Sequence, residues 1–321
     1  MTKPRIKENI ELGKFTTFKI GGPARYFLEV RSQREMIDGV KWAEEKGLLF
    51  FILAGGSNLL VADKGFSGLV IKLQTPNYQL LTTNYQLPTN IIHAEAGVRL
   101  SDLVALSLKN GLSGLEWAAG IPRATIGGAV WGNAGAFGRT IGEIVEKVEV
   151  LDSTNYQLPT TNYSKKDCGF GYKDSIFKRD RGLVILSADL VLGKKNKEEV
   201  KEEVKKILKY RKDHHPIEPS AGSVFKNIKA DDEVEKLFKD FPEAKVFENR
   251  GEVPAGWLIE RCGLKGKKIN GAQISPKHAN FIVNTGSAQA EDVVKLIKLA
   301  RQKAREKFGV ALEEEIQYVG F

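Results

Sequence analysis

The chain has 321 residues, of which 42% are hydrophobic and 28% are charged, and its formal net charge is +9. These values suggest two or three domains of ordinary size in a soluble globular protein, and they exclude a disordered or fibrous chain. The positive charge favours an anionic partner, either nucleic acid or a nucleotide sugar with a phosphorylated cofactor.

The first segment has the pattern strand, helix, strand. Residues 26–30 are good strand formers, and Ser32 with Glu35 makes an S-x-x-E capping box that predicts a helix up to Gly47. Residues 48–53 are typical of a buried strand and lead directly into a glycine-rich loop. Further strands are predicted at residues 70–71, 91–96 and 145–151, with a helix at 101–109.

A seven-residue repeat stands apart from these elements. The heptapeptide TNYQLPT occurs at residues 83–89 and again at 154–160, with partial copies beside each. Each full copy carries a proline and a single aliphatic residue, which excludes a coiled coil. We predict that residues 76–90 and 154–163 are inserted surface loops without a catalytic role, because surface loops tolerate insertion at little cost.

The pattern changes after residue 190. The apolar residues on one face of the next predicted helix are Val200, Val204, Ile207 and Leu208, and this helix ends at residues 214–216. A last helix spans the apolar positions from Val293 to Phe308 and ends at Gly309, and a strand at 316–319 closes the chain. We therefore place a domain boundary near residues 195–215 and expect the C-terminus to return and complete a site.

Two glycine-rich blocks are the strongest functional signal. The first, AGGSNLL at residues 54–60, follows a predicted buried strand, so its backbone N–H groups can cradle a phosphate. It matches neither the Rossmann pattern nor the P-loop pattern. The second block comprises residues 120–122, 127–128 and 133–138. Two such blocks indicate an extended ligand held against the backbone, such as a dinucleotide.

Polar positions outside these blocks do not identify a reaction by themselves. Ser223 lies among small residues, where a serine usually caps a turn, and no G-x-S-x-G elbow is present. Glu315 is one of three successive glutamates, a pattern typical of a surface, and Lys173 lies in a polar segment typical of a loop. Cys168, Cys262 and the four histidines have no metal-type spacing, so no metal site is predicted.

These positions belong to a series of short blocks that occur in a fixed order. The blocks are TTFKIGGPA (16–24), AGGSNLL (54–60), GIP (120–122), GG (127–128), NAGAFG (133–138), FGYKDS (170–175), GSVFKN (222–227), AGWLIE (255–260), KHANF (277–281) and LEEEI (312–316). Any one block is weak evidence, whereas their joint occurrence in this order is very specific. Over nearly its whole length, apart from the two repeat stretches, the chain resembles the family of UDP-N-acetylenolpyruvoylglucosamine reductases (MurB).

The resemblance implies an α+β fold. It has a two-part FAD-binding module of the vanillyl-alcohol oxidase (PCMH) type and a C-terminal α+β substrate domain. We expect residues 1–73 to form the first FAD-binding subdomain, with residues 308–321 returning to it. Residues 74–200 are then the second subdomain, and residues 201–307 bind the UDP-sugar. We expect the family form without an extra substrate-covering insertion, because the segment after Ser223 is short.

The resemblance also implies an enzyme, a UDP-N-acetylmuramate dehydrogenase of peptidoglycan precursor synthesis, with FAD as cofactor and NADPH as co-substrate. NADPH delivers hydride to the flavin and leaves. The substrate, UDP-N-acetylglucosamine enolpyruvate, then receives hydride at C3 of its enolpyruvyl group and a proton at C2. Hydride addition builds negative charge into the adjacent carboxylate, as an enolate-like state.

Each family role falls on a residue of this chain. Ser223 matches the proton donor, Glu315 matches the glutamate that stabilises the enol form, and Lys173 occupies the third catalytic position. The expected cofactor-binding residues are Gly55, Gly56, Ser57, Asn58, Leu59, Gly120, Ile121, Pro122, Thr125, Gly127, Gly128, Ala134 and Gly135. The expected substrate-binding residues are Tyr172, Lys226, Asn227 and His278.

Two positions depart from the family pattern. The family has arginine where this chain has Lys173, so the charge is kept while the bidentate grip of a guanidinium on a carboxylate is lost. We therefore expect weaker substrate positioning or lower turnover. Residues 121–125 form a turn that is one residue longer than the usual one and lacks its glycine, so the flavin contact there is expected to differ.

Two alternatives remain open. Another FAD-dependent oxidoreductase of the same cofactor group would lack the blocks around Ser223 and Glu315. A non-catalytic nucleotide-sugar or RNA-binding protein rests on charge and glycine content alone. The basic run at 194–212 is interrupted by glutamates, and the cluster at 265–268 has no interleaved aromatics, so no nucleic-acid partner is expected.

The ends and the apolar runs of the chain bear on its compartment. The N-terminus has no apolar core of a secretory signal, and no run reaches the roughly 18 apolar residues of a membrane span. We therefore expect a cytoplasmic protein without a membrane partner. The family resemblance favours a monomer.

Overall fold

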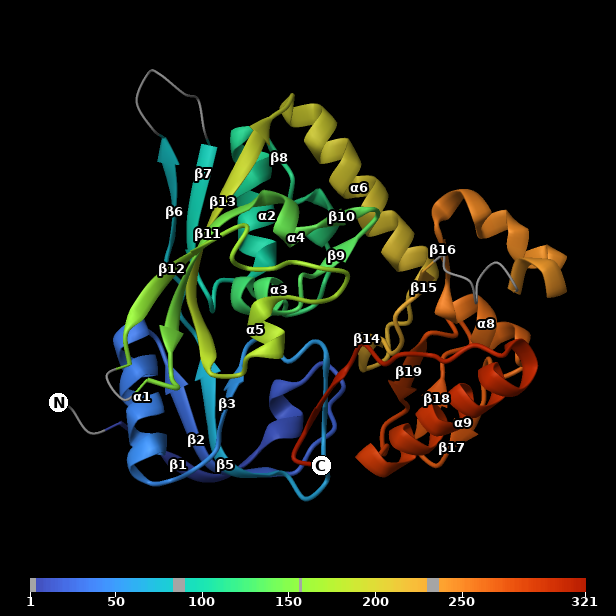
Figure 1. Ribbon diagram of the computed structural model, residues 1–321, viewed down its shortest axis with the longest axis horizontal. Helices are drawn as coiled ribbons and strands as arrows, with labels where there is room; N and C mark the ends of the chain where they lie inside the picture. Colours follow the sequence, from blue (N-terminus) through green and yellow to red (C-terminus); the bar gives the residue numbers. More distant parts are fainter. Residues whose placement is uncertain (1–3, 83–89, 156–157, 230–236) are drawn as a thin grey trace. The chain divides into compact units, whose positions relative to one another are not determined.

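The computed structural model describes residues 4–82, 90–155, 158–229 and 237–321. The chain divides into two compact units, which are described separately (Figure 1). Unit 1 comprises Met1–Ile10, Ala24–Gly56 and Ser67–Asp213, and unit 2 comprises Glu11–Pro23, Ser57–Phe66 and His214–Phe321. The predicted division into three parts, with limits at residues 73, 200 and 307, stays a prediction.

A four-stranded sheet opens unit 1. Its order is β1 (Lys7–Glu11), β2 (Pro23–Val30), β5 (Phe66–Leu73), β3 (Phe50–Leu53), and β3 runs parallel to β5. Helix α1 (Gln33–Glu45) follows β2, and the Ser32 side chain accepts a hydrogen bond from the Glu35 N–H (3.2 Å). The Glu35 carboxylate in turn accepts from the Arg31 N–H (2.7 Å). The predicted helix start is confirmed. The second bond of the capping box comes from the Arg31 N–H instead of the Ser32 N–H.

The second sheet of unit 1 is antiparallel. Its strands, in order, are β12 (Thr160–Ser164), β11 (Val145–Asp152), β13 (Leu183–Lys194), β7 (Asn90–Glu95) and β6 (Tyr78–Thr82), and β8 (Leu112–Ser113) also pairs with β13. The helices of this part are α2 (Leu100–Asn110), η2 (Glu116–Ala118), α3 (Ile126–Trp131), α4 (Ile141–Ile144), α5 (Ile176–Arg179) and α6 (Lys197–His214). A short hairpin joins β9 (Gly135–Ala136) to β10 (Arg139–Thr140).

The two faces of this sheet differ in character. Val148, Ala188 and Ala94 lie side by side on one face and belong to the core of unit 1. The neighbouring positions of the same strands project to the other face, which is polar, because successive side chains alternate along a strand. There Asp189 accepts from Lys147 (3.0 Å) and lies 2.6 Å from the His93 ring. The apolar face is the one that the helices cover.

The prediction that residues 76–90 and 154–163 form surface loops is wrong in part. Tyr78–Thr82 forms edge strand β6, and Thr160–Ser164 forms edge strand β12; residues 83–89 and 156–157 lie outside the described residues. Tyr, Thr and Leu are good strand formers, and an edge strand tolerates the polar Asn and Gln between them. Pairing also satisfies the backbone N–H and C=O groups of the strand beside each repeat. Strands β6 and β12, which overlap the partial copies beside the two full repeats, therefore form the two edges of the sheet.

The predicted helix after residue 195 is confirmed as α6. Val200, Val204 and Ile207 are buried, as expected, whereas Leu208 is 45% exposed. Successive helical residues are rotated by about 100°, so Leu208 lies beyond the buried stripe that Ile207 completes.

Unit 2 is built around an antiparallel sheet. Its order is β14 (Ser220–Ser223), β19 (Phe281–Asn284), β18 (Ala272–Ile274), β17 (Lys268–Ile269). Two further pairs are β15 (Ile228–Lys229) with β16 (Glu252–Val253), and β4 (Leu59–Val61) with β20 (Gln317–Val319). The helices are η1 (Leu12–Phe15), η3 (Pro242–Arg250), α8 (Ala255–Arg261) and α9 (Ala290–Phe308), and residues 237–240 are also helical.

Three separate chain segments build the core of unit 2. Phe18, Ile20 and Leu60 are buried in the same apolar cluster as the inner faces of α8 and α9. The Asp63 carboxylate accepts from the Ala290 N–H (2.9 Å) at the start of α9, and Gly309, at a φ of 72°, ends that helix as predicted. The predicted return of the C-terminus is the parallel pairing of β20 with β4.

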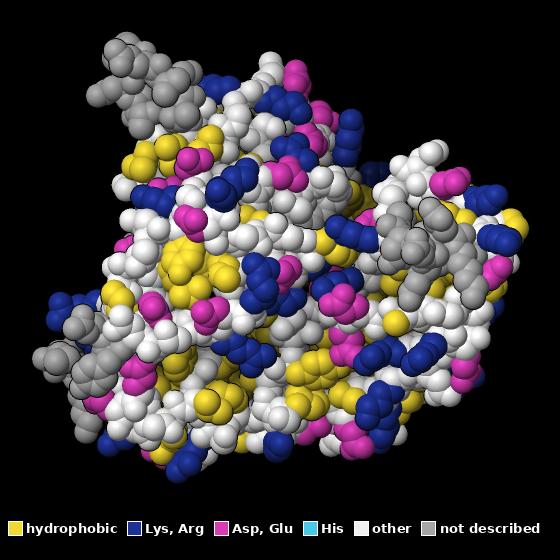
Figure 2. All heavy atoms as spheres, viewed as in Figure 1, with side chains coloured by type: hydrophobic (Ala, Val, Ile, Leu, Met, Phe, Trp, Pro, Cys, Tyr) yellow, Lys and Arg dark blue, Asp and Glu magenta, His cyan; other side chains and the backbone are white. Residues whose placement is uncertain are grey.

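Charged side chains are mixed on the face seen in Figure 2, where Lys and Arg are interspersed with Asp and Glu. None of the described helices combines the length and the apolar character that a membrane span requires.

Candidate functional site

The two glycine-rich blocks meet in unit 1. Gly55 follows β3 and lies against the turn at residues 121–125, where a β-carbon on Gly55 would lie 1.7 Å from the Arg123 carbonyl oxygen. A β-carbon on Gly128 would lie 3.4 Å from the Ala54 side chain. Only glycine fits at position 55, because the buried backbone there packs directly against the backbone of the turn at residues 121–125.

The lengthened turn at 121–125 has a backbone explanation. Arg123 has a φ of 57°, in the left-handed region that glycine favours, and this costs an arginine roughly 1–2 kcal/mol. The turn is held by the Leu100 N–H, which donates to the Ala124 carbonyl (2.9 Å), and by the Gly127 N–H, which donates to the Ala96 carbonyl (2.8 Å). Arg123 therefore takes the conformation of the glycine that the family pattern led us to expect.

Positive charge gathers beside these blocks. Lys72 is 8% exposed, and its ammonium donates to the carbonyl oxygens of Ala54 and Leu73. Burial, together with the nearby charges of Arg123 and Arg99, lowers the pKa of Lys72 to about 8. Burial and Arg99 also lower the pKa of Arg123. Like charges held together in this way favour an anionic ligand.

One buried polar atom also calls for a ligand. The Thr125 hydroxyl oxygen, in a residue that is 5% exposed, has no hydrogen-bond partner among the described residues. Together with the cations around Lys72, it fits a ligand that carries phosphate groups, such as a dinucleotide. The residues present are therefore compatible with FAD.

Lys173 lies beside the second glycine block, also in unit 1. It occupies a tight turn in which the Gly171 N–H donates to the Asp174 carbonyl (3.0 Å), and its φ is 54°. Its ammonium donates to the Gly135 carbonyl (3.2 Å). Tyr172, the neighbouring predicted substrate contact, is half-buried in the same turn. Asn133 fixes the turn, because its side-chain amide donates to the Gly171 carbonyl (2.6 Å).

Arg211 was missed by the sequence analysis. From α6 its guanidinium donates to the Ala119 carbonyl (2.8 Å) and the Trp117 carbonyl (3.0 Å), directly before Gly120. It also lies over the Phe137 ring, 5.3 Å from the centroid, in the second glycine block. In the sequence Arg211 is one of many basic residues on a helix, and nothing marks it as a support of residues 92 positions away.

Ser223 and Glu315 are brought together in unit 2. Ser223 is the last residue of β14, opposite Phe281. The next residue, Val224, accepts a hydrogen bond at its carbonyl from the Glu315 N–H (2.7 Å). Two predicted catalytic residues that are far apart in the sequence therefore lie on adjacent backbone segments.

Asn58 supports the same arrangement within unit 2. Its side-chain amide donates to the Glu315 carbonyl (3.1 Å), and its own carbonyl accepts from the Gln317 N–H (2.9 Å). Ser57 and Leu59, the other predicted cofactor residues of this stretch, are half-buried beside it.

Three predicted substrate residues of unit 2 lie between Ser223 and Glu315 in the sequence, and each of them makes polar contacts. Lys226 forms an ion pair with Glu313. Asn227 donates to the Glu252 carboxylate (2.9 Å) and accepts from the Ala255 N–H (3.3 Å). His278 accepts from the Asn280 N–H at Nδ1 (3.2 Å), and burial lowers the pKa of His278, which keeps this nitrogen available as an acceptor.

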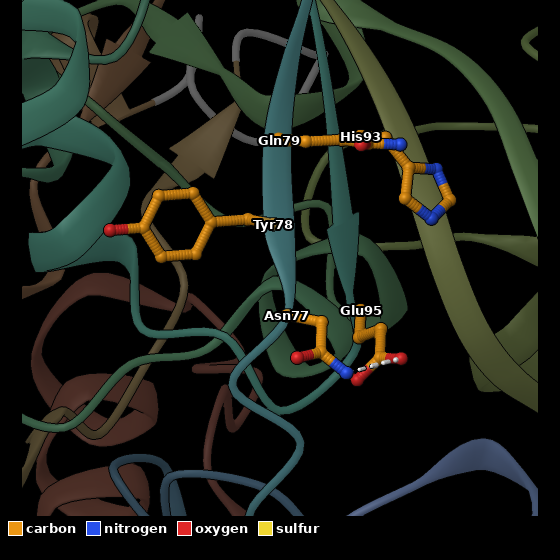
Figure 3. Close-up of a pocket in the computed structure, with 5 residues that line it drawn as sticks. All are labelled: Asn77, Tyr78, Gln79, His93 and Glu95. Atoms are coloured by element: carbon orange, nitrogen blue, oxygen red, sulfur yellow. Dashed lines mark hydrogen bonds between the residues drawn. The ribbon is translucent and has the colours of Figure 1, made fainter.

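A separate hollow of about 210 Å³ lies on unit 1 at the edge formed by β6 and β7. Figure 3 shows Asn77 bonded to Glu95, with Tyr78 pointing away from His93 across the sheet. Gln79 completes the lining. None of the predicted site residues lines this hollow. Among the described residues, no group of three or more His, Cys, Asp or Glu side chains is arranged to hold a metal ion.

Two family models match the chain. The model described as the C-terminal domain of UDP-N-acetylenolpyruvoylglucosamine reductase matches residues 213–319. The model described as an FAD binding domain matches residues 24–158. The predicted fold class, an α+β chain with an FAD-binding module before a C-terminal α+β domain, is confirmed by these matches together with the structural likeness given next.

The relatives that resemble the chain cover nearly all of it. A UDP-N-acetylenolpyruvoylglucosamine reductase of Caldicellulosiruptor bescii is 38% identical over 96% of this chain and 89% of the relative. A reductase with the same name from Caldanaerobacter subterraneus subsp. tengcongensis is 39% identical over 98% of this chain and 97% of the relative. The crystal structure of UDP-N-acetylenolpyruvylglucosamine reductase (MurB) from Thermus caldophilus is 32% identical, with a TM-score of 0.76 over 98% of this chain and 99% of that one.

Proposed function

Because the chain belongs to the family of UDP-N-acetylenolpyruvoylglucosamine reductases, we propose that Ser223 and Glu315 carry out the proton chemistry of its reaction. The enzyme is a UDP-N-acetylmuramate dehydrogenase of peptidoglycan synthesis. It reduces UDP-N-acetylglucosamine enolpyruvate to UDP-N-acetylmuramate, with FAD as cofactor and NADPH as reductant. The chemistry that bound FAD supplies is hydride transfer, from NADPH to the flavin and from the flavin to C3 of the enolpyruvyl group.

The single observation that carries the proposal is the hydrogen bond from the Glu315 N–H to the Val224 carbonyl. It places the backbone of Glu315 beside the residue that follows Ser223, so both side chains start from one small part of unit 2. The Ser223 hydroxyl donates the proton that C2 of the substrate receives. A serine hydroxyl is a weak acid, and it needs neighbouring groups that stabilise the charge developing in the transition state.

Glu315 is the group that we assign to this task. As negative charge moves into the substrate carboxylate, a hydrogen bond shared with the Glu315 carboxyl stabilises the enol form. Asn58 supports this role, because its amide holds the Glu315 carbonyl (3.1 Å) and so restricts the backbone that carries the carboxyl group. This preorganisation lowers the cost of orienting the group during the reaction.

Lys173 is proposed to neutralise the substrate carboxylate. This proposal rests on its place in the FGYKDS block and on its charge. Its ammonium donates to the Gly135 carbonyl (3.2 Å) and can exchange that neutral acceptor for a carboxylate, with which a hydrogen bond is stronger. Tyr172, Lys226, Asn227 and His278 are proposed as contacts of the UDP-sugar.

The residues proposed to hold FAD are those of the two glycine-rich blocks. They are Gly55, Gly56, Ser57, Asn58, Leu59, Gly120, Ile121, Pro122, Thr125, Gly127, Gly128, Ala134 and Gly135. Support comes from the buried Thr125 hydroxyl, which has no hydrogen-bond partner among the residues that the structure describes. The cations at Lys72 and Arg123 supply positive charge for the diphosphate.

The compartment, oligomeric state, partners and domain limits of the enzyme are also proposed. We propose a cytoplasmic monomer without nucleic-acid or membrane partners. We also propose three functional parts: residues 1–73 with 308–321, residues 74–200 and residues 201–307. The mixture of charges on the visible face supports the proposal against nucleic acid, because binding to nucleic acid favours a one-sided basic stripe.

An anaerobic two-step experiment tests the catalytic assignment. NADPH should bleach the flavin absorbance of the purified yellow protein, and UDP-N-acetylglucosamine enolpyruvate should then restore it without oxygen. In Ser223→Ala the bleaching step should remain, and the restoring step should slow by roughly 10²- to 10⁴-fold, the usual range for loss of a general acid. Glu315→Gln should show the same separation. Normal restoration in Ser223→Ala would remove Ser223 from the chemistry.

A further inference from the structure

The segment that follows Ser223 leaves its sheet at once. β14 ends at Ser223, and its pairing with β19 is irregular between Ser220 and Ser223. Gly222 has a φ of 79°, a conformation that bends the chain. Val224 and Phe225 therefore continue outside the regular ladder, and their backbone groups need other partners.

Asn280 supplies three of these partners. Its carbonyl accepts from the Val224 N–H (2.8 Å), its side-chain oxygen accepts from the Phe225 N–H (3.0 Å), and its side-chain amide donates to the Phe225 carbonyl (2.9 Å). The carboxamide thus bonds both backbone groups of one residue, as a neighbouring strand would. Asn280 is 4% exposed, so these bonds are shielded from water.

The opposite edge of the same segment carries Glu315. The Val224 carbonyl accepts from the Glu315 N–H (2.7 Å), and the Lys226 N–H donates to the Glu313 carbonyl (2.8 Å). Phe225 forms the bridge between them with Glu314. The segment from Val224 to Lys226 therefore lies between Asn280 on one side and the glutamate segment on the other.

We propose that Asn280 is a positioning residue for reduction of the enolpyruvyl substrate. Its carboxamide fixes the Val224–Phe225 backbone and thereby the placement of Ser223 relative to Glu315. This inference rests on the roles proposed above for Ser223 and Glu315. A shift of the segment by about 1 Å would misplace both groups, and misplacement on this scale can cost about 100-fold in rate.

A second explanation must be separated from this one. The side chains of Val224 and Phe225 are buried in the core of unit 2 and also restrain the segment. If they suffice, changes at Asn280 will lower stability and leave the reaction rate alone. The matched control is Asn284, the last residue of β19, whose first residue follows Asn280 directly. It is a buried asparagine whose amide donates to the Phe18 carbonyl (3.2 Å) and whose oxygen accepts from the Gly286 N–H (2.8 Å).

Three full-length, FAD-loaded variants make the comparison. Asn280→Asp keeps the shape and the acceptor but removes the donor, so that two oxygens face each other at the Phe225 carbonyl. Asn280→Ala leaves room for a water molecule that can bridge both Phe225 groups, and it serves if the aspartate protein does not fold. Asn284→Ala removes a comparable buried amide away from Ser223.

The two half-reactions are measured separately by anaerobic stopped flow. Flavin bleaching by NADPH should stay within about twofold of wild type in all three variants. Restoration of flavin absorbance by saturating UDP-N-acetylglucosamine enolpyruvate should slow by roughly 10- to 100-fold in Asn280→Asp, less in Asn280→Ala, and within about twofold in Asn284→Ala. The saturating rate should change more than the substrate concentration that gives half of it.

Other outcomes would overturn the inference. They are an unchanged restoring step in both Asn280 variants, an equal slowing of both half-reactions, or an equal slowing in Asn284→Ala. The Ser223→Ala protein separates the two levels of proposal. If it restores flavin absorbance normally, the catalytic assignment fails. If it does not, while both Asn280 variants behave as wild type, only the positioning role fails.

Discussion

The Arg123 carbonyl oxygen occupies the space that a β-carbon on Gly55 would need, at 1.7 Å from its ideal position. Gly55→Ala must therefore push two backbone segments apart. We expect a loss of about 1–3 kcal/mol or more in the free energy of unfolding and at least a tenfold loss of FAD affinity. Measurements are chemical denaturation and quenching of flavin fluorescence. In Gly193→Ala, where the nearest atom lies at 4.0 Å, both should be unchanged. Full FAD affinity in Gly55→Ala would contradict the assignment of this loop.

Lys173 combines a functional charge with a strained backbone, at a φ of 54°. Lys173→Gly should relieve the strain and raise the free energy of unfolding by about 1 kcal/mol, while the lost charge lowers kcat/KM for the enolpyruvyl substrate by roughly 10-fold or more. Lys173→Arg should remain active and can exceed wild type, because a guanidinium grips a carboxylate with two bonds. Thermal unfolding and steady-state kinetics check both expectations. An inactive arginine variant that still binds FAD would rule out a shared role.

Lys72 should make stability depend on pH. Its pKa is lowered from 10.5 to about 8 by burial, so between these values the folded chain binds fewer protons than the unfolded chain. The free energy of unfolding of the FAD-free protein should therefore rise as pH increases from 8 to 10.5, by an amount on the order of 2–3 kcal/mol. Lys72→Met lacks this contribution. Chemical denaturation across this range, compared between the two proteins, tests the difference; parallel curves would contradict it.

The Glu315 carbonyl accepts from two side chains, Asn58 (3.1 Å) and Gln317 (3.0 Å). Each donor can compensate for loss of the other. Asn58→Ala and Gln317→Ala should each be mild, while the double variant should lose about 1 kcal/mol more stability than the sum of the two. In the double variant, the enolpyruvyl substrate should also restore flavin absorbance more slowly than the product of the two single-variant slowdowns predicts. Strict additivity in this double-mutant cycle would show that the two donors do not act on a common backbone.

Local patterns in the sequence predicted what depends on neighbouring residues. The start of α1 at Ser32 and the end of α9 at Gly309 follow from capping rules, because the groups that satisfy each helix end lie within a few positions. The family blocks predicted the reaction in the same way, through short motifs in order. The prediction of a loop was wrong at Tyr78–Thr82. The local sequence there contains both turn residues and strand formers, and the strand formers pair with the open edge of the sheet.

Contacts between distant residues could not be predicted from the chain alone. Asn280 bonds Phe225 across 55 positions, and Arg211 bonds Ala119 across 92. In the sequence Asn280 is part of a family block and Arg211 is one of many basic residues on a helix, and neither pattern shows which distant backbone the side chain bonds. The left-handed conformation of Arg123, whose carbonyl packs against Gly55, could not be predicted either, because an arginine does not favour it.

Unit 2 also has a consequence for synthesis of the protein. Asn58 and Glu315 are 257 residues apart, and β4 finds its partner in β20 only when nearly the whole chain has left the ribosome. Until then Phe18, Ile20 and Leu60 have no core to enter, and exposed apolar side chains of this kind invite aggregation and chaperone binding. A fragment that starts at residue 214 would lack the same segments. The part that carries Ser223 and Glu315 therefore becomes complete last, and only as part of the whole chain.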